Sequence, residues 1–268
     1  MAMRRSLTHG LSVWAALWRV RGLHELHYRA NLALNLFQVL IDLTIGVVTI
    51  LLVFGNVDAL NGWTEPELLV VLGTYTILDS VIRAVVLPNM YALVQDVQDG
   101  AFDNVLAMPA DEQLVVTTRE LSVWDLTGVL IGGAVAAFGA RDVAGVSPAH
   151  VAGYAVLVVT AFCIVYGFFV AVASLTFRLV DLRDLLFRLF QAASYSGRWP
   201  LGIYPNWLRV TLTAIVPIGL AVTIPSSALV GRMTPTQLVL SLVVTAVVLI
   251  WSRWVFRRAI RSYSGASA

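Results

Sequence analysis

The chain has 268 residues, of which 59% are hydrophobic and only 13% are charged. A soluble domain carries about twice that fraction of charged residues, so the composition excludes an ordinary soluble protein and predicts an all-α integral membrane protein. The balance of 18 basic and 16 acidic residues is too even to suggest a nucleic-acid partner, for which a concentrated basic face is needed. All the basic residues are arginine, which excludes a Walker A lysine, so this chain has no P-loop ATPase site of its own.

The first 31 residues are basic and amphipathic. Leu7, Leu11, Trp14 and Trp18 are spaced so that they share one face of a helix, and arginines follow them. Tryptophan and arginine at a membrane boundary are typical of a helix that lies in the interface. We therefore expect a retained interfacial helix over residues 6–31.

Spanning a bilayer takes about 20 predominantly apolar residues, and several segments meet this requirement. Five of them are Leu32–Phe54, Leu68–Leu87, Leu114–Ala140, Val151–Phe177 and Leu238–Phe256. Between Asp184 and Gly231 two more segments compete, Leu185–Tyr204 and Val210–Val230. Arginines cluster near both ends of the chain, so the positive-inside rule places both termini in the cytoplasm and requires an even number of spans.

We predict six transmembrane helices on this basis. The segment 205–230 contains Pro205, Pro217 and Pro225, and such broken segments are tolerated where protein or water surrounds the backbone. It is therefore predicted as a re-entrant hairpin on the outer side, before the last span. Charge counting favours 210–230 as the fifth span and the prolines favour 185–204, so this choice stays open.

Ionisable residues within spans are costly and mark candidate functional positions. Asp79 and Arg83 are four residues apart on one helix and can neutralise each other. Asp42 has no cation near it in the sequence, so we expect it to face a partner helix or a polar cavity. These three residues are the candidates for a translocation pathway or a helix interface.

The loop between the second and third spans, residues 91–112, is acidic where inner loops are usually basic. Asp99-Gly100 predicts a turn, and a short helix presenting Phe102, Val105 and Leu106 stops before Pro109. An apolar edge flanked by carboxylates is typical of a segment that docks on another protein. The alternative is an ordinary loop helix tucked against the bundle.

Two motifs carry a resemblance to a known family. The run QDGAFDNVLAMP, residues 98–109, resembles the coupling-helix region of ABC-2 type transporter permeases. The run SGRWPLGIYPNWLRVTLTAIVPIGLAVTIPSSALVGR, residues 196–232, resembles the C-terminal signature of the same family. The order of the elements fits as well, so the resemblance covers nearly the whole chain as one transmembrane domain, residues 1–268.

The resemblance implies the permease subunit of an ATP-driven exporter in the plasma membrane of a bacterium. It implies a second permease, identical or related, and two separate cytoplasmic ATPase subunits that bind ATP and Mg, while this chain binds no cofactor or metal. By position, the contact with the ATPase would be made by Asp99, Gly100, Phe102, Asp103, Leu106 and Pro109. The acidic cluster of Asp96, Asp99 and Asp103 would then imply a basic patch on the ATPase.

Two other classes remain as alternatives, a membrane-embedded lipid-modifying enzyme and an ATP-independent carrier. An enzyme needs clustered catalytic groups, but the acidic loop contains no His, Lys or Cys. A carrier often shows internal repeats, and the sequence has no clear one. Cys163 is the single cysteine and the four histidines lack ligand spacing, so neither a disulfide nor a metal site is predicted.

Overall fold

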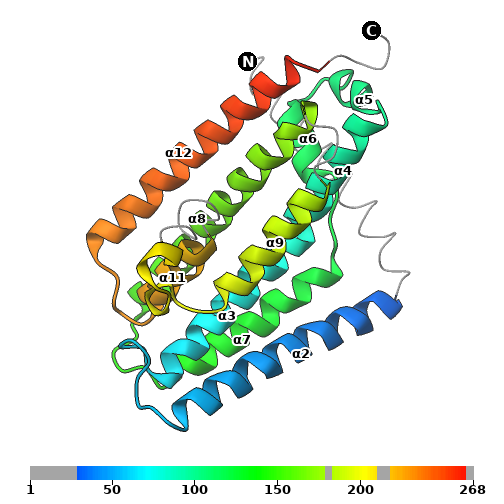
Figure 1. Ribbon diagram of the computed structural model, residues 1–268. Coiled ribbons are helices and arrows are strands. Elements are labelled where there is room, and N and C mark those ends of the chain that lie inside the picture. Colours follow the sequence, from blue (N-terminus) through cyan, green and yellow to red (C-terminus); the bar gives the residue numbers. More distant parts are fainter. Residues whose placement is uncertain (1–28, 179–182, 210–217, 264–268) are drawn as a thin grey trace.

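The computed structural model describes residues 29–178, 183–209 and 218–263. The predicted interfacial helix over 6–31 lies almost wholly outside these residues, as does Pro217. Figure 1 shows a bundle of helices that run along roughly one axis, with α5 and α6 together at one end, here called the α5 end. The helices are α2 (Arg29–Phe54), α3 (Glu65–Val81), α4 (Leu87–Gln98), α5 (Phe102–Leu106), α6 (Glu112–Thr118), α7 (Thr127–Arg141), α8 (Pro148–Ala173), α9 (Arg183–Gly197), α11 (Ile218–Leu229) and α12 (Pro235–Ile260). Short helical turns are η1 (Ile82–Val86), η2 (Trp124–Leu126), η3 (Ser174–Phe177) and η4 (Leu201–Ile203).

Four helical segments among the described residues are long and apolar enough to cross a membrane. They are Leu32–Phe54, Glu65–Gln98, Pro148–Phe177 and Pro235–Ile260. They contain the predicted first, second, fourth and last spans. The prediction of a helical, multi-pass membrane protein is thus confirmed, whereas the number of six spans stays a prediction.

The second span is much longer than a bilayer requires. Glu65–Gln98 is one helical run of 34 residues in which the π-helical turn η1 joins α3 to α4. At 1.5 Å per residue this run is about 51 Å long, against about 30 Å of hydrocarbon. With the predicted span Leu68–Leu87 in the hydrocarbon, we expect the excess to lie in α4, from which α5 follows directly.

The predicted third span, Leu114–Ala140, is wrong as a continuous helix. The helical run stops after α6, passes through residues 119–123, and resumes with η2 and α7. The break packs against a second defect, because Pro88 has no N–H to donate to the Ala84 carbonyl. The Ser122 N–H donates to that carbonyl instead, at 2.9 Å.

Asn89 fastens the same junction between α4 and the break. Its side-chain oxygen accepts from the Glu120 N–H at 2.9 Å, and its amide donates to the Glu120 carbonyl at 2.8 Å. The amide also donates to the Val85 carbonyl at 2.6 Å. Backbone groups at the two helix interruptions therefore form hydrogen bonds with each other and with the Asn89 side chain. These bonds hold the broken segment against α4.

Among the described residues, the most extensive contact between two helices is the crossing of α3 over α7. A Cβ built on Gly132 would lie 2.7 Å from the Gly73 carbonyl oxygen and 2.8 Å from the Ile77 nitrogen. A Cβ on Gly73 would collide with backbone atoms of Gly132 and Ala136. Glycines on the two helices are thus where the two backbones touch, as is usual for helix pairs in lipid.

At the end opposite α5, polar contacts join segments far apart in the sequence. Glu67 forms an ion pair with Arg232 at 2.7 Å, and the Arg232 guanidinium lies 5.3 Å from the centre of the Trp63 ring. The Arg209 side chain donates to the carbonyl oxygens of Leu201, Gly202 and Tyr204. These bonds satisfy the irregular backbone that follows Pro200.

Neither candidate for the fifth span appears as a full-length helix in the described residues. α9 has 15 residues and α11 has 12, with Pro225 inside α11. Pro205 precedes a short turn closed by the bond from the Arg209 N–H to the Pro205 carbonyl at 2.9 Å. The re-entrant hairpin over 205–230 and the choice of fifth span therefore stay predictions.

Candidate functional site

The acidic loop forms the turn and short helix that its sequence predicts. α4 ends at Gln98, and the Asp99 N–H still donates to the Gln95 carbonyl at 2.9 Å. Gly100 has a φ of 71°, which a residue without a Cβ adopts at little cost. The chain then reverses into α5, which ends at Leu106 ahead of Pro109.

The apolar side of α5 faces the bundle. Phe102 is 0% exposed and Val105 is 3% exposed, while Leu106 is 42% exposed. The expectation that all three side chains are presented to a partner is therefore corrected, since only Leu106 reaches the surface. A five-residue helix has no second apolar face, so burying Phe102 and Val105 commits one side of it to the bundle.

Phe102 is held by an aromatic cluster built from three parts of the chain. Its ring lies edge-on to Phe177 at 4.8 Å and to Tyr263 at 5.3 Å between centroids. Phe177 lies 5.8 Å from Tyr263 and 6.2 Å from Phe256. Because Phe177 ends the α8 run and Phe256 belongs to α12, the cluster connects α5 to two long helices.

The acidic cluster divides between the surface and the bundle. Asp99 and Asp103 are exposed, whereas Asp96 forms an ion pair with Arg119. The prediction that Asp96 faces an ATPase is therefore corrected, because its charge is neutralised within the chain. Asp103 lies close to Tyr263, and burial together with the Asp103 charge raises the pKa of that phenol.

The exposed side of the loop offers two carboxylates beside an apolar strip. Leu106 is followed by Met108 and Pro109, which are also exposed. Met108 was not singled out from the sequence, although flexible methionines are common at binding surfaces. We name the set of Asp99, Asp103, Leu106, Met108 and Pro109 the docking surface.

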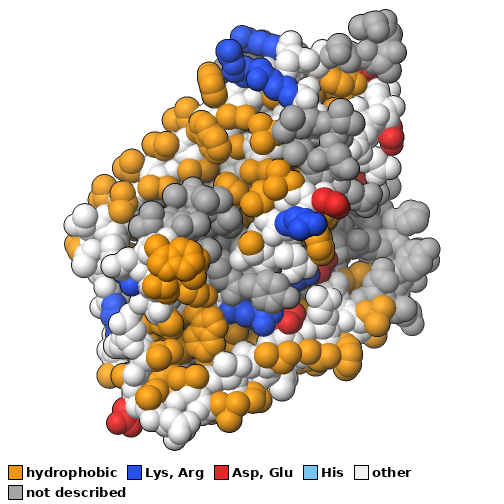
Figure 2. All heavy atoms as spheres, viewed as in Figure 1, with side chains coloured by type: hydrophobic (Ala, Val, Ile, Leu, Met, Phe, Trp, Pro, Cys, Tyr) orange, Lys and Arg blue, Asp and Glu red, His pale blue; other side chains and the backbone are white. Residues whose placement is uncertain are grey.

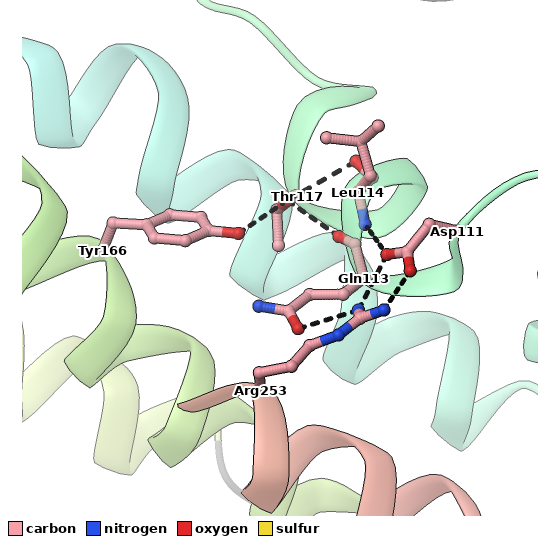
Figure 3. Close-up of polar contacts among 6 residues, drawn as sticks. All are labelled: Asp111, Gln113, Leu114, Thr117, Tyr166 and Arg253. Atoms are coloured by element: carbon pink, nitrogen blue, oxygen red, sulfur yellow. Dashed lines mark hydrogen bonds and ion pairs between the residues drawn. The ribbon is translucent and has the colours of Figure 1, made fainter. Parts of the chain in front are cut away.

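A polar network fixes the other end of the loop to α12 and is shown in Figure 3. Arg253 donates to one Asp111 oxygen at 2.8 Å, pairs with the other oxygen, and donates to the Gln113 side chain at 3.1 Å. Asp111 also caps α6 by accepting from the Leu114 N–H at 3.0 Å. One carboxylate thus begins α6 and ties it to the last span.

A second contact joins α6 to α8. The Tyr166 hydroxyl donates to the Thr117 hydroxyl at 3.1 Å, and Thr117 donates to the Gln113 carbonyl at 2.8 Å. Sequence reasoning missed this whole network, because Tyr166 and Thr117 carry no charge that would mark them. Arg253 was visible as the one charge in the last predicted span, but its partner lies 142 residues away.

The Asp111 carboxyl titrates differently from a free aspartate. Burial by itself would raise its pKa, but the hydrogen bonds from Arg253 and the Leu114 N–H, with the charges of Arg253 and Arg257, lower the pKa below its ordinary value. A group with a lowered folded-state pKa stabilises the fold above its unfolded pKa, near 4. That contribution is lost as the pH falls through the folded-state pKa.

We expect Asp111→Asn to lower the free energy of unfolding by about 0.5–1 kcal/mol at neutral pH, since the pair is partly exposed. Asparagine caps a helix as well as aspartate does, so the variant removes the charge and keeps the cap. Thermal unfolding of both proteins from pH 7 downward should show the difference closing below about pH 4. Asp142→Asn, at the opposite end, is the control, and equal melting temperatures for Asp111→Asn and wild type at pH 7 would contradict the assignment.

Comparison with known proteins identifies a family that matches most of the chain. A family model described as ABC-2 family transporter protein matches residues 40–267, which include the docking surface, the aromatic cluster and the Pro-rich segment. The chain belongs to the ABC-2 transporter family. No curated protein and no solved structure matches it.

This ABC-2 family transporter also carries charges within its spans, and the structure pairs them. Asp79 and Arg83 meet at 2.7 Å on the second span, as their spacing predicts. Asp42 pairs with Arg198 at 3.0 Å, so its cation comes from the end of α9, 156 residues away. Ion pairing accounts for the position of all three residues, and a role for them in the translocation pathway stays a prediction.

Residues 29–178, 183–209 and 218–263 contain no group of three or more His, Cys, Asp or Glu side chains that could hold a metal ion. Cys163, half-buried in α8, is a free thiol whose surroundings are apolar.

Proposed function

We propose that this chain is the permease subunit of an ATP-driven ABC exporter. It would form the translocation pathway with a second permease and be driven by separate ATPase subunits that bind ATP and Mg. The observation that carries the proposal is the connection of the docking surface to α8 and α12 through Phe102. A loop used for docking alone would not need such a link, whereas a loop that transmits motion does.

Two chains of contacts run from the docking surface into the bundle. The first passes from α5 through Phe102 to Phe177 and Phe256. The second passes from α6 through Asp111 to Arg253 and through Thr117 to Tyr166. Both end on α8 and α12, so a displacement of the loop would reach these two helices together.

The distribution of arginines supports a cytoplasmic position for the α5 end. Described arginines at that end include Arg119, Arg178, Arg253, Arg257, Arg258 and Arg261. The opposite end has Arg141, Arg209 and Arg232, among the acidic residues Asp58, Glu65, Glu67 and Asp142. By the positive-inside rule, the docking surface would meet a cytoplasmic ATPase and the C-terminus would also be cytoplasmic.

The exposed apolar face of α2 is an observation that favours a second permease subunit. Its large apolar side chains are turned away from the rest of the chain, among them Leu34, Phe37, Ile45, Leu51 and Leu52. Lipid alone could cover them, but α2 also holds the Asp42–Arg198 pair at mid-span. A second copy or a related permease against this face would shield that pair from hydrocarbon.

Membership in a transporter family favours this proposal over the lipid-modifying enzyme. The ATP-independent carrier differs from it in one testable respect, the need for an ATPase. We expect Asp103→Arg and Asp99→Arg to reduce co-purification of the cognate ATPase by fivefold or more, since charge-assisted contacts at a docking surface carry about 1–3 kcal/mol. Co-purification from the expressing cell, followed by measurement of ATP-dependent export, gives the readout.

The matched control is Asp58→Arg, an exposed aspartate in the loop at the opposite end. It reverses the same charge and should leave the ATPase bound. Wild-type recovery of the ATPase with Asp103→Arg and Asp99→Arg combined would remove the docking surface from the proposal. Export that continues without any ATPase would favour the carrier.

A further inference from the structure

The outer face of α12 is an uninterrupted apolar stripe. Val239, Val243, Val247, Ile250 and Trp254 are all exposed, and at 100° per residue they fall within a sector of about 80°. The opposite side of the helix buries Ser241, Thr245, Ser252, Phe256 and Ala259. Figure 2 shows this stripe as a row of orange side chains along the edge of the bundle that α12 forms.

The stripe has the length of a hydrocarbon layer. Pro235 and Trp254 are separated by about 28 Å of helix at 1.5 Å per residue, close to the 30 Å of an average bilayer. Tryptophan is enriched where the apolar layer meets the headgroups. Trp254 therefore marks the point on α12 where hydrocarbon ends and headgroups begin.

Three arginines continue the same stripe beyond Trp254. At 100° per residue, Arg257 and Arg261 fall inside the sector of the apolar residues and Arg258 lies about 20° beyond it. All three side chains are exposed. The Arg258 guanidinium lies 5.8 Å from the centre of the Trp254 ring. Figure 2 shows a blue patch of basic side chains where the orange row ends, at the α5 end of α12.

No ion pair joins these three arginines to a carboxylate within the described ranges. Arg253, one turn earlier, is the arginine that turns toward the loop and pairs with Asp111. Arg257 reaches Asp111 only through the longer-range effect of its charge. The guanidinium groups of the stripe thus face the surroundings of the bundle at headgroup depth.

We propose that Arg257, Arg258 and Arg261, with Trp254, bind the phosphate groups of anionic phospholipids in the leaflet at the α5 end. Guanidinium groups bind phosphate oxygens in pairs, and clusters of basic residues next to a span attract acidic lipids. A lipid is favoured over a protein partner because the arginines extend the lipid-facing stripe rather than the docking surface. The ring of Trp254 would cover the glycerol region of the same lipid.

The position of this site gives it a consequence for the loop. The same two turns of α12 carry Phe256 in the aromatic cluster and Arg253 in the Asp111 pair. The inner face of this end of α12 anchors α5 and α6. A headgroup bound on its outer face would restrict the movement of the same helix end. Anionic lipid would therefore steady the loop without touching it.

The test uses the purified full-length chain in nanodiscs of phosphatidylcholine with trace spin-labelled lipid. We expect wild type to immobilise labelled phosphatidylglycerol in preference to labelled phosphatidylcholine, and the preference to shrink as salt screens the charges. Arg258→Gln should lower the relative affinity for phosphatidylglycerol by about fivefold. The triple variant Arg257→Gln, Arg258→Gln and Arg261→Gln should abolish the preference.

Arg141→Gln is the matched control, because Arg141 is an exposed arginine at the opposite end of the bundle. It should leave the preference intact, and each variant should melt as wild type does in phosphatidylcholine. If the triple variant fails to assemble, Arg258→Gln alone decides. An unchanged preference in these variants overturns the proposal, and if they lose the ATPase instead, the arginines belong to a protein interface.

Discussion

Replacing Phe102 by alanine is expected to lower the free energy of unfolding of the loop by about 3–5 kcal/mol, the usual cost of removing a buried phenylalanine. The ring is fully buried and contacts Phe177 and Tyr263 edge-on. Its loss leaves a cavity between α5 and the ends of α8 and α12. Amide hydrogen exchange over residues 99–109 should therefore rise steeply, and thermal unfolding should begin at a lower temperature.

The matched control for this change is Leu106→Ala on the same helix. Leu106 is exposed, so its removal should change the stability by less than about 0.5 kcal/mol. If the proposed function holds, the two variants distinguish ATPase binding from the transmission of motion to the bundle. Phe102→Ala should retain ATPase binding and lose ATP-driven export, whereas Leu106→Ala should weaken binding. Wild-type exchange rates in Phe102→Ala would contradict the anchoring role.

The second large effect is expected at the crossing of α3 and α7. Gly73→Ala or Gly132→Ala places a Cβ against backbone atoms of the opposite helix, and backbone cannot rotate away as a side chain can. Overpacking of this kind costs about 1–3 kcal/mol and sometimes more. We expect both variants to unfold at lower temperature in detergent, and the double variant to assemble poorly.

Gly133→Ala is the control for the crossing, one residue along the same helix. A Cβ at Gly133 meets nothing within 4 Å, and alanine favours helix over glycine by about 1 kcal/mol. Gly133→Ala should therefore be neutral or stabilising. Equal effects of Gly132→Ala and Gly133→Ala would show that helix propensity, and not the contact between backbones, controls this position.

Features set by local sequence were predicted well. The turn at Asp99-Gly100 and the Asp79–Arg83 pair depend on residues at most four apart, so spacing alone determines them. The long apolar runs of the first, second, fourth and last spans were equally clear. Membership in the ABC-2 family followed from two motifs that each lie within one continuous segment.

Features that depend on distant partners were missed or predicted wrongly. An apolar edge such as that of Phe102 and Val105 suits an external partner and the chain's own bundle equally well, and only the packing decides between them. The pairing of Asp111 with Arg253 crosses 142 positions and has no local signal. The same holds for Arg119, whose neutralisation of Asp96 took one acid out of the predicted docking cluster.

The break in the third predicted span had a partial signal in the sequence. Arg119, Glu120 and Asp125 all fall in the first half of Leu114–Ala140, and three charges are unusual in a continuous span. Hydropathy could not show the contact with a different helix. Pro88 has no N–H for the Ala84 carbonyl, and this carbonyl accepts from the Ser122 N–H of the broken segment. The Ala84 carbonyl that accepts from Ser122 lies 38 residues before it in the sequence, which is too far for a local signal.

The bond from Ser122 to Ala84, with the Asn89–Glu120 bonds beside it, closes the chain between these residues into a ring. The segment from α4 to α6, including the docking surface, is held together at its base by this junction, in addition to its contacts with α8 and α12. A push on the docking surface cannot stretch such a ring away from its base, so we expect it to pivot there. On the proposed function, we expect such a pivot to move the ends of α8 and α12 as well, so that a small displacement of the docking surface would tilt these two helices.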